Sequence, residues 1–417
     1  MRANKEDKKT TSRTKLILVS SILIVILAAF LSRALPRLTS LSLHLSSGIR
    51  QHLPSPVAVL NNTNMSSYAK ELEVAQLAVQ RAAILTKRVF HEKAKGTVSK
   101  DDKSPVTIGD FGAQALIISA LKANFPDDEI VAEEEAAQLR EDANLKQTIW
   151  DLVKSTQLSD TAAENLLGGA IKDEETMLTM IDYGNSKGGA KGRIWAIDPI
   201  DGTKGFLRGG QYAVCLALMV DGDVKVGVLG CPNLPIDDAA LLSGGMESGQ
   251  TDEGRGVLFS GVLGQGATSR PLTTGALAKE KSISMKAITD IAAATFCESV
   301  EAGHSSHGDQ AEIAKLLGIT NPSVRMDSQA KYASIARGAG DIYLRLPVSA
   351  TYQEKIWDHA AGDLIVREAG GAVTDIHGNK LDFSIGRTLA NNKGVIAAPA
   401  AAQPQVLKVV QEVLSKK

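Results

Sequence analysis

Cysteine is scarce in this chain of 417 residues, which contains only Cys215, Cys231 and Cys297. Three scattered thiols exclude a disulfide scaffold and a cysteine-rich zinc cluster, so we expect buried free thiols. Aromatic residues make up only 4% of the chain, so Ala, Val, Ile and Leu must form most of the core. Neither sign of charge is in excess, because 46 Lys and Arg face 47 Asp and Glu, and this balance argues against a protein that wraps nucleic acid.

Long uncharged runs are also rare, but one lies close to the N-terminus. The seventeen residues between Lys15 and Arg33 carry no charge, and as an α-helix at ~1.5 Å per residue they nearly span a bilayer core. Six basic residues precede this run: Arg2, Lys5, Lys8, Lys9, Arg13 and Lys15. Because basic residues favour the cytoplasmic side, we predict a basic tail over 1–15 and a single-pass transmembrane helix over 16–33. A cleaved signal peptide, an organelle-targeting segment and a buried core helix are the alternatives.

The stretch over 34–66 is predicted to be a stalk, because it is rich in Ser and has no sustained hydrophobic period. Asn61 and Asn64 both fit the N-glycosylation pattern. Their position beyond the anchor agrees with the charge rule and predicts that the following domain lies in the secretory lumen of the ER or Golgi. A cytoplasmic or organellar location is the alternative, since free thiols suit a reducing compartment.

The rest of the chain has the periodicities of a mixed α/β (α+β) protein. Apolar residues recur at three- and four-residue steps over 67–90 and again over 111–125, which predicts two helices. The run RIWAID predicts a buried strand, and two apolar runs around Asp221-Gly222 predict a β-hairpin. Helix and strand patterns then alternate to the C-terminus. We predict two α/β subdomains in series, over 67–252 and 253–417.

Carboxylates gather where predicted strands end. Asp198 and Asp201 stand three apart on a turn bent by Pro and Gly, which can bring two carboxylates to one point. Oxygen ligands without His or Cys select hard ions such as Mg²⁺ or Mn²⁺. Three ordinary alternatives exist. The two aspartates can form a solvated loop or a helix cap, the glutamates of VAEEE can be a solvated charge run, and Asp110 can be the N-cap of the helix over 111–125.

Four segments together resemble a known superfamily: SPVTIGD, VAEEE, WAIDPIDGTKGF and WDHAAGDLIVREAGG. They are similar to motifs of the lithium-sensitive, magnesium-dependent phosphatases of the inositol monophosphatase superfamily. Within it, the chain most resembles the 3′(2′),5′-bisphosphate nucleotidases, through KGTVSKDDKSPVTIGDFGAQ, ESVEAGHSSH, MDSQAKYASIARG and IYLRLPVSATYQEKIWDHAAG. The resemblance covers about residues 68–415 and implies a layered α-β-α-β-α sandwich of two subdomains, with the active site between them.

The resemblance also implies a site for two or three Mg²⁺ ions. Its ligands would be the carboxylates of Glu133, Asp198, Asp201 and Asp358 and the backbone carbonyl of Ile200. The superfamily mechanism implies that Asp110 and Thr203 orient and deprotonate an attacking water, which displaces the ester oxygen without a phosphoenzyme. Asp110 would also help to hold a further ion or its water, while Thr203 alternatively caps the segment after its turn. Ala132 departs from the usual glycine before the first glutamate, and its methyl group could tilt the strand end slightly.

Substrate contacts are implied in the second half of the chain. Ser328, Lys331 and Arg345 match the residues that hold a nucleotide 5′-phosphate, and His304 matches one near the ribose and base. The implied activity is removal of the 3′-phosphate from adenosine 3′,5′-bisphosphate to give AMP, with 3′-phosphoadenylyl sulfate as a further substrate. An inositol phosphatase, which needs no second phosphate clamp, is the alternative enzyme. A catalytically inactive, membrane-tethered scaffold is the alternative of another class. We expect a monomer without a nucleic-acid partner.

Overall fold

The computed structural model describes residues 68–92, 97–99, 105–240, 242–244, 252–301, 303, 305–349 and 351–416. Beyond residue 63 the chain forms one compact unit. The predicted basic tail, transmembrane helix and stalk lie outside the described residues, as do Asn61, Asn64 and His304. Within the described ranges, no helix is both long enough and apolar enough to cross a membrane.

One of the two large sheets has seven strands, in the spatial order β3-β4-β5-β6-β7-β8-β9. Its strands are β3 (Glu129–Ala132), β4 (Arg193–Asp201), β5 (Ala213–Val220), β6 (Asp223–Pro235), β7 (Arg255–Val262), β8 (Gly266–Pro271) and β9 (Lys281–Ile283). β3 and β4 are parallel, and each later neighbouring pair is antiparallel. Because Ala132 pairs with Ile197, the next residues, Glu133 and Asp198, leave this parallel pair side by side.

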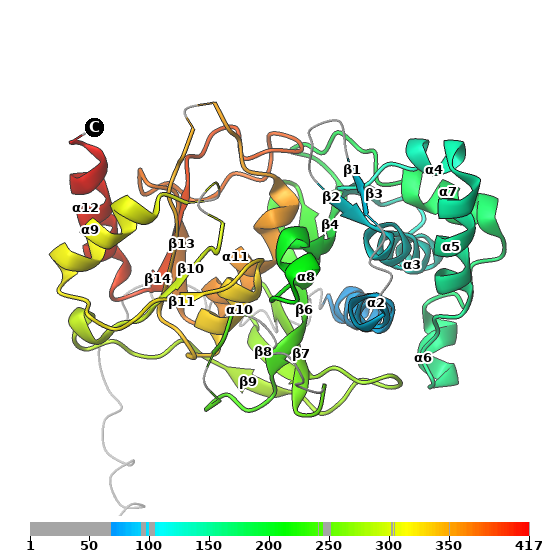
Figure 1. The fold of residues 1–417 in the computed structure, drawn as a ribbon, viewed down its shortest axis with the longest axis horizontal. Coiled ribbons are helices and arrows are strands. Elements are labelled where there is room, and N and C mark those ends of the chain that lie inside the picture. The colour runs from blue at the N-terminus through cyan, green and yellow to red at the C-terminus, as the bar shows by residue number, and fades with distance from the viewer. Residues whose placement is uncertain are drawn as a thin grey trace, which may run out of the picture. The chain divides into compact units, whose positions relative to one another are not determined.

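Two long helices, α2 (Ala69–His91) and α3 (Ile108–Asn124), pack on one face of this sheet, as Figure 1 shows. Val79 of α2 and Ile117 of α3 share a buried cluster with Trp195 of β4. Four short helices follow and lie beyond α3 in Figure 1: α4 (Ala137–Glu141), α5 (Ala143–Lys154), α6 (Thr161–Leu166) and α7 (Glu174–Asp182). A short hairpin of β1 (Thr97–Ser99) and β2 (Pro105–Thr107) precedes α3.

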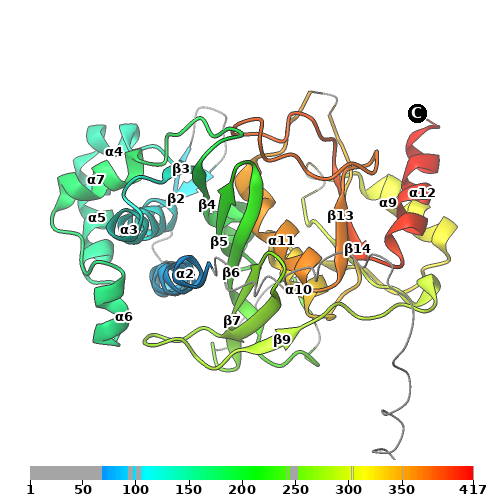
Figure 2. The same cartoon turned by 180° about the vertical axis from the view of Figure 1, so that it is seen from behind.

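The second large sheet has the order β11-β10-β12-β14-β13. Its strands are β10 (Phe296–Glu298), β11 (Val324–Arg325), β12 (Ile342–Arg345), β13 (Gly371–Thr374) and β14 (Val395–Pro399). Helices α10 (Ala330–Ala336) and α11 (Ala360–Glu368) lie between the two sheets in both Figure 1 and Figure 2. Their residues Ala333 and Ile365 belong to one buried cluster with Phe259 of β7 and Ala397 of β14. This middle layer therefore joins the sheets through a single core.

The other face of the second sheet is covered by α9 (His307–Leu317) and α12 (Gln403–Leu414), seen at one side of Figure 2. Ile313 and Val410 from these helices pack with Ile342 and Ile396 of the sheet. The layers thus run helix, sheet, helix, sheet, helix. The mixed α/β fold predicted from the sequence is confirmed.

Local predictions can be compared with the same structure. The helix predicted over 67–90 is α2, and the predicted hairpin joins β5 to β6 through Asp221 and Gly222, whose φ angles of 52° and 80° suit a two-residue turn. All three cysteines are buried and free. The predicted subdomain boundary at residue 252 falls between β6 and β7, which pair with each other, so the first sheet extends past it to β9.

Candidate active site

A cavity of about 490 Å³ brings together residues from strand ends of both sheets and from the middle layer. We name four of its carboxylates, Glu133, Asp198, Asp201 and Asp358, the acidic wall. We name Ser328, Lys331 and Arg345 the basic wall. Both sets line this one cavity, together with Ile200 and Thr203. Sequence positions up to 225 residues apart therefore meet, as the sequence resemblance implied.

The acidic wall begins where β4 stops pairing regularly with β5. Asp198 faces Cys215 in the ladder, and the register shifts before Asp201. The backbone N–H of Ile200 donates to Oδ1 of Asp198 at 3.1 Å, which closes the turn. Gly202 then takes a φ of 86°, a left-handed conformation that favours glycine, and α8 (Thr203–Arg208) begins. This bend directs both carboxylates into one cavity, whereas a regular strand would send them to opposite faces.

Three carboxylates of this wall are crowded. Asp198, Asp201 and Asp358 each offer an oxygen that lies within 4.8 Å of the others. Burial raises the pKa of Asp198 and of Asp358 well above the usual range, and neighbouring carboxylates raise both further. Burial raises the pKa of Asp201 only to about 6, because Lys331 and the N–H of Gln329 favour its charged form. A buried set of hard oxygen donors that repel one another fits Mg²⁺ or a similar divalent ion.

The fourth carboxylate, Glu133, follows the end of β3. The alanine that replaces the usual glycine before it is accommodated by another glycine, because a β-carbon added to Gly184 would lie only 2.6 Å from Cβ of Ala132. The N–H of Ala132 also donates to the carbonyl of Gly184 at 2.8 Å. The methyl group therefore occupies space that Gly184 leaves open, and Glu133 still lines the cavity.

The two predicted catalytic residues have different surroundings. Thr203 lines the cavity as the first residue of α8, and its hydroxyl donates to the carbonyl of Ile200 at 3.2 Å. Asp110 is buried and is not among the described residues that line the cavity. Its Oδ2 accepts hydrogen bonds from the N–H of Thr107 at 2.8 Å and from the Thr107 hydroxyl at 2.5 Å. Its charge still contributes to raising the pKa of Asp198.

One alternative considered for Asp110 is wrong. Helix α3 begins at Ile108, so Thr107 is its N-cap and Asp110 is the third helical residue of a capping box. The sequence pattern placed the helix start three residues too late because Ile108 and Gly109 precede the obvious apolar period.

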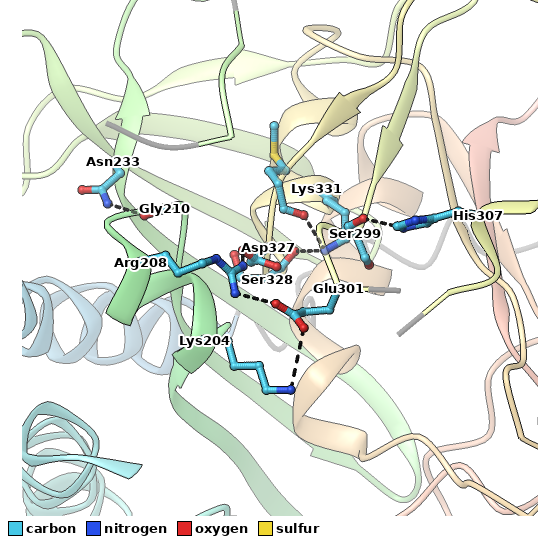
Figure 3. Close-up of polar contacts among 11 residues, drawn as sticks. Lys204, Arg208, Gly210, Asn233, Ser299, Glu301, His307, Asp327, Ser328 and Lys331 are labelled. Carbon is cyan, nitrogen blue, oxygen red and sulfur yellow. Dashed lines mark hydrogen bonds and ion pairs between the residues drawn. The ribbon is translucent and has the colours of Figure 1, made fainter. Parts of the chain in front are cut away.

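The basic wall lies on the segment that leads into α10. Ser328 has a φ of 70°, which is unusual for a residue with a β-carbon. Lys331 is buried, and its ammonium donates to the carbonyls of Met326 at 3.2 Å and Ser328 at 2.9 Å, as Figure 3 shows. Burial lowers the pKa of Lys331 to about 8, although Asp201 and Asp327 favour its charge. This ammonium is therefore mostly charged at pH 7, but it loses its proton at a lower pH than an exposed lysine does.

Arg345 completes the basic wall from the end of β12. Its Nη2 lies 2.7 Å from a carboxylate oxygen of Glu354, which also lies 3.4 Å from Nε2 of His359. Although burial disfavours its charge, His359 and Arg345 hold the pKa of Glu354 at about 2. Within the described chain, Nε of Arg345 is buried without a hydrogen-bond partner, and the residue lines the cavity.

The two walls are joined where α8 meets the Ser328 segment. The N–H of Gln329 donates to Oδ2 of Asp201 at 2.5 Å. Gly205 of α8 allows close approach, because a β-carbon there would lie 2.5 Å from an oxygen of Asp327. Arg208 of the same helix binds Asp327 at 2.7 Å and Glu301 at 2.5 Å (Figure 3). The turn that carries Asp198 and Asp201 and the basic wall are therefore positioned by shared contacts.

The cavity also contains residues that sequence reasoning did not single out. They include Lys204, Asp327, Tyr343, Tyr352, Lys355 and Arg387. Tyr343, Tyr352 and Lys355 lie inside the segment IYLRLPVSATYQEKIWDHAAG, so its likeness to known proteins was a usable signal. Arg387 lies outside every segment that carried the resemblance, and only the fold brings it to the cavity.

Comparison with known proteins agrees with this geometry. Residues 68–415 match the inositol monophosphatase family, and the chain belongs to that family. Two solved structures share the fold. Thermotoga maritima IMPase has a TM-score of 0.52 at 20% identity, covering 83% of this chain and 98% of its own. The extragenic suppressor protein suhB from Bartonella henselae has a TM-score of 0.53 at 19% identity, covering 82% and 98%.

Curated relatives narrow the assignment within the family. A 3′(2′),5′-bisphosphate nucleotidase of Emericella nidulans is 69% identical over 349 residues, which are 84% of this chain and 99% of the relative. The protein of the same name from Schizosaccharomyces pombe is 49% identical over 355 residues, 84% of this chain and 97% of the relative. The chain is thus a phosphatase of the 3′(2′),5′-bisphosphate nucleotidase group.

Proposed function

We propose that this enzyme hydrolyses the 3′-phosphate of adenosine 3′,5′-bisphosphate, giving AMP and phosphate. The observation that carries the proposal is the presence of both walls in one cavity, with Lys331 buried and Arg345 holding an unused donor. A substrate with two phosphates can place one at the acidic wall and the other at the basic wall. The names of the relatives from Emericella nidulans and Schizosaccharomyces pombe support the same reading.

We propose 3′-phosphoadenylyl sulfate as a second substrate. It carries the same 3′-phosphate, and its 5′ group remains anionic, so Lys331 and Arg345 can bind it by the same charge-assisted contacts.

The proposed cofactor is Mg²⁺, in two or three ions held by the acidic wall and the carbonyl of Ile200. When bound, such ions neutralise phosphate oxygens, lower the pKa of a water and stabilise the leaving alkoxide. The hydroxyl of Thr203, at the cavity surface, and the buried carboxylate of Asp110 would orient and deprotonate the attacking water in relay. Lys331 and Arg345 would hold the 5′-phosphate and so fix the position of the 3′-phosphate.

A phosphate-release panel tests these proposals on the purified protein with Mg²⁺. The substrates are adenosine 3′,5′-bisphosphate, 3′-phosphoadenylyl sulfate, inositol 1,4-bisphosphate and an inositol monophosphate. We expect the two nucleotides to give the highest kcat/KM. A preference for inositol monophosphate would favour the alternative enzyme, and release from none of the four would favour the inactive scaffold. Activity that persists in excess chelator would contradict the metal proposal.

We also propose a location, which depends on sequence outside the described residues. The basic tail, the uncharged run and the candidate glycosylation sites Asn61 and Asn64 support a single-pass protein with its catalytic domain in the secretory lumen. Endoglycosidase treatment of the full-length protein is the test. A mobility shift that disappears in Asn61→Gln/Asn64→Gln supports the lumen. Absence of a shift, with protease access to the catalytic domain in sealed microsomes, would place that domain in the cytosol.

A further inference from the structure

Arg387 contacts the strand end that carries Glu133. Its Nη2 donates to the carbonyl of Ala132, the last residue of β3, at 2.6 Å. Its Nη1 donates to the carbonyls of Ser186 at 2.9 Å and Gly184 at 3.2 Å. One guanidinium therefore donates hydrogen bonds to three backbone carbonyls at the carboxyl end of β3.

The same residue also contacts the segment that carries Asp358. Its guanidinium carbon lies 4.9 Å from the centre of the Trp357 ring. Trp357 is the residue immediately before Asp358 in the chain. The backbone carbonyl of Arg387 accepts a hydrogen bond from the N–H of Ile356 at 3.2 Å, and the neighbouring Thr388 forms a β-bridge with Lys355. Arg387 is thus held to the Asp358 segment by backbone hydrogen bonds and by its contact with the Trp357 ring. Its side chain holds it to the strand that leads to Glu133.

These contacts need the particular chemistry of arginine. A planar guanidinium can donate along several directions in its plane while one face stacks on an indole ring, whereas a lysine ammonium is a compact point charge. Burial lowers the pKa of Arg387, but the nearby carboxylates of Glu135 and Glu133 favour its charged form. The positively charged Arg387 therefore lines the same cavity as Glu133 and Asp358 of the acidic wall.

We infer that Arg387 is a positioning residue for the metal site: it holds Glu133 and Asp358 at a fixed separation, so that a divalent ion meets both carboxylates already in place. The inference rests on the proposed metal-dependent function. Groups that orient metal ligands without touching the metal typically change metal affinity by ~10–100-fold when they are altered.

The test uses the full chain, stripped of metal, in wild type and Arg387→Lys. We expect calorimetric titration with Mn²⁺ to show binding about tenfold weaker in Arg387→Lys. The activation midpoint for Mg²⁺ should rise by a similar factor, while KM for the nucleotide at saturating Mg²⁺ stays within about twofold. Arg387→Gln, which keeps a planar donor group without the charge, should lie between wild type and Arg387→Lys.

Arg193 offers a matched control at the other end of the same strand pair. Its Nε binds Asp128 at 2.8 Å, its Nη2 binds Glu71 at 3.0 Å, and its guanidinium carbon lies 5.5 Å from the ring centre of Phe125. Arg193→Lys should therefore lower the melting temperature without changing Mn²⁺ affinity. Melting temperatures of all variants, measured metal-free, separate lost stability from lost positioning.

Each result decides a different question. Unchanged Mn²⁺ affinity in Arg387→Lys, or an equal loss in Arg193→Lys, would overturn the positioning role. A raised nucleotide KM with unchanged metal affinity would also overturn it and make Arg387 a substrate contact. If wild type itself binds no divalent ion, the proposed function fails instead. Should Arg387→Lys not fold, Trp357→Leu removes the ring that Arg387 and Lys355 both contact, and a Mn²⁺ affinity equal to wild type there would contradict the inference.

Discussion

The acidic wall and the basic wall line the same cavity, but their charges are balanced in different ways. In the acidic wall, Asp198 and Asp358 are surrounded by other carboxylates, and their pKa values rise well above normal. In the basic wall, Lys331 is held by two carbonyls and Arg345 by Glu354. The cations of the basic wall thus have acceptors within the protein, whereas most charges close to Asp198 and Asp358 are other carboxylates. Without metal, the acidic wall should therefore be destabilised by repulsion between its carboxylates, whereas the basic wall should not.

The largest effect should come from removing one carboxylate of the acidic wall. Asp198→Asn keeps the shape of the side chain but loses a ligand charge, so kcat should fall by at least about 10³-fold. The metal-free protein should melt no lower than wild type, because one source of repulsion is gone. Steady-state kinetics and metal-free melting curves measure both. Asp221→Asn in the hairpin turn is the control, and substantial turnover in Asp198→Asn would contradict the metal assignment.

A cation of the basic wall should matter for only one class of substrate. Lys331→Met keeps the apolar stem and removes the charge, so kcat/KM for adenosine 3′,5′-bisphosphate should fall by about 10–100-fold, as expected for a charge-assisted contact of ~1.5–3 kcal/mol. Adenosine 3′-monophosphate, which lacks the 5′ group, should be nearly unaffected. Lys315→Met on the exposed surface of α9 is the control. Equal losses on both nucleotides would remove the basis for a 5′-phosphate clamp.

The strand end beneath the acidic wall can be tested through its packing. Gly184→Ala adds a β-carbon 2.6 Å from that of Ala132, so the free energy of unfolding should fall by ~1–3 kcal/mol. Ala132→Gly in the same chain should recover most of this loss, and urea unfolding of both single variants and the double variant measures the coupling. Additive effects would show that the two residues do not compensate each other.

The smallest effect concerns pH and again separates the walls. The pKa of Lys331 is lowered to about 8, so this side chain is mostly charged at pH 7 and mostly neutral at pH 9. KM for adenosine 3′,5′-bisphosphate should therefore rise a few-fold across this range, since the neutral amine binds phosphate weakly. KM for adenosine 3′-monophosphate should stay flat, and so should both profiles in Lys331→Met. The same rise for both nucleotides in wild type would assign it to another group.

Much of this arrangement could be predicted from sequence where local signals were strong. The apolar period of α2 and the Asp221-Gly222 turn specify their own local structure, and the residues of the two walls, which the resemblance implied, line one cavity. The pairing of β6 with β7 crosses the predicted boundary at residue 252, because the antiparallel sheet continues through the Gly-rich stretch between these two strands. Arg387 was missed because its three carbonyl partners lie 201, 203 and 255 residues earlier in the chain, and only the fold brings them together.

The hydrogen bond from Gln329 to Asp201 has a thermodynamic consequence. Asp201 belongs to the proposed ion site, and Gln329 sits between Ser328 and the helix that carries Lys331. An ion at Asp201 and a phosphate at Ser328 thus act on opposite ends of one short contact. Coupling free energies are reciprocal, so the factor by which the ion alters nucleotide affinity is also the factor by which the nucleotide alters ion affinity. For this enzyme, a binding isotherm for either component is defined only when the concentration of the other is stated.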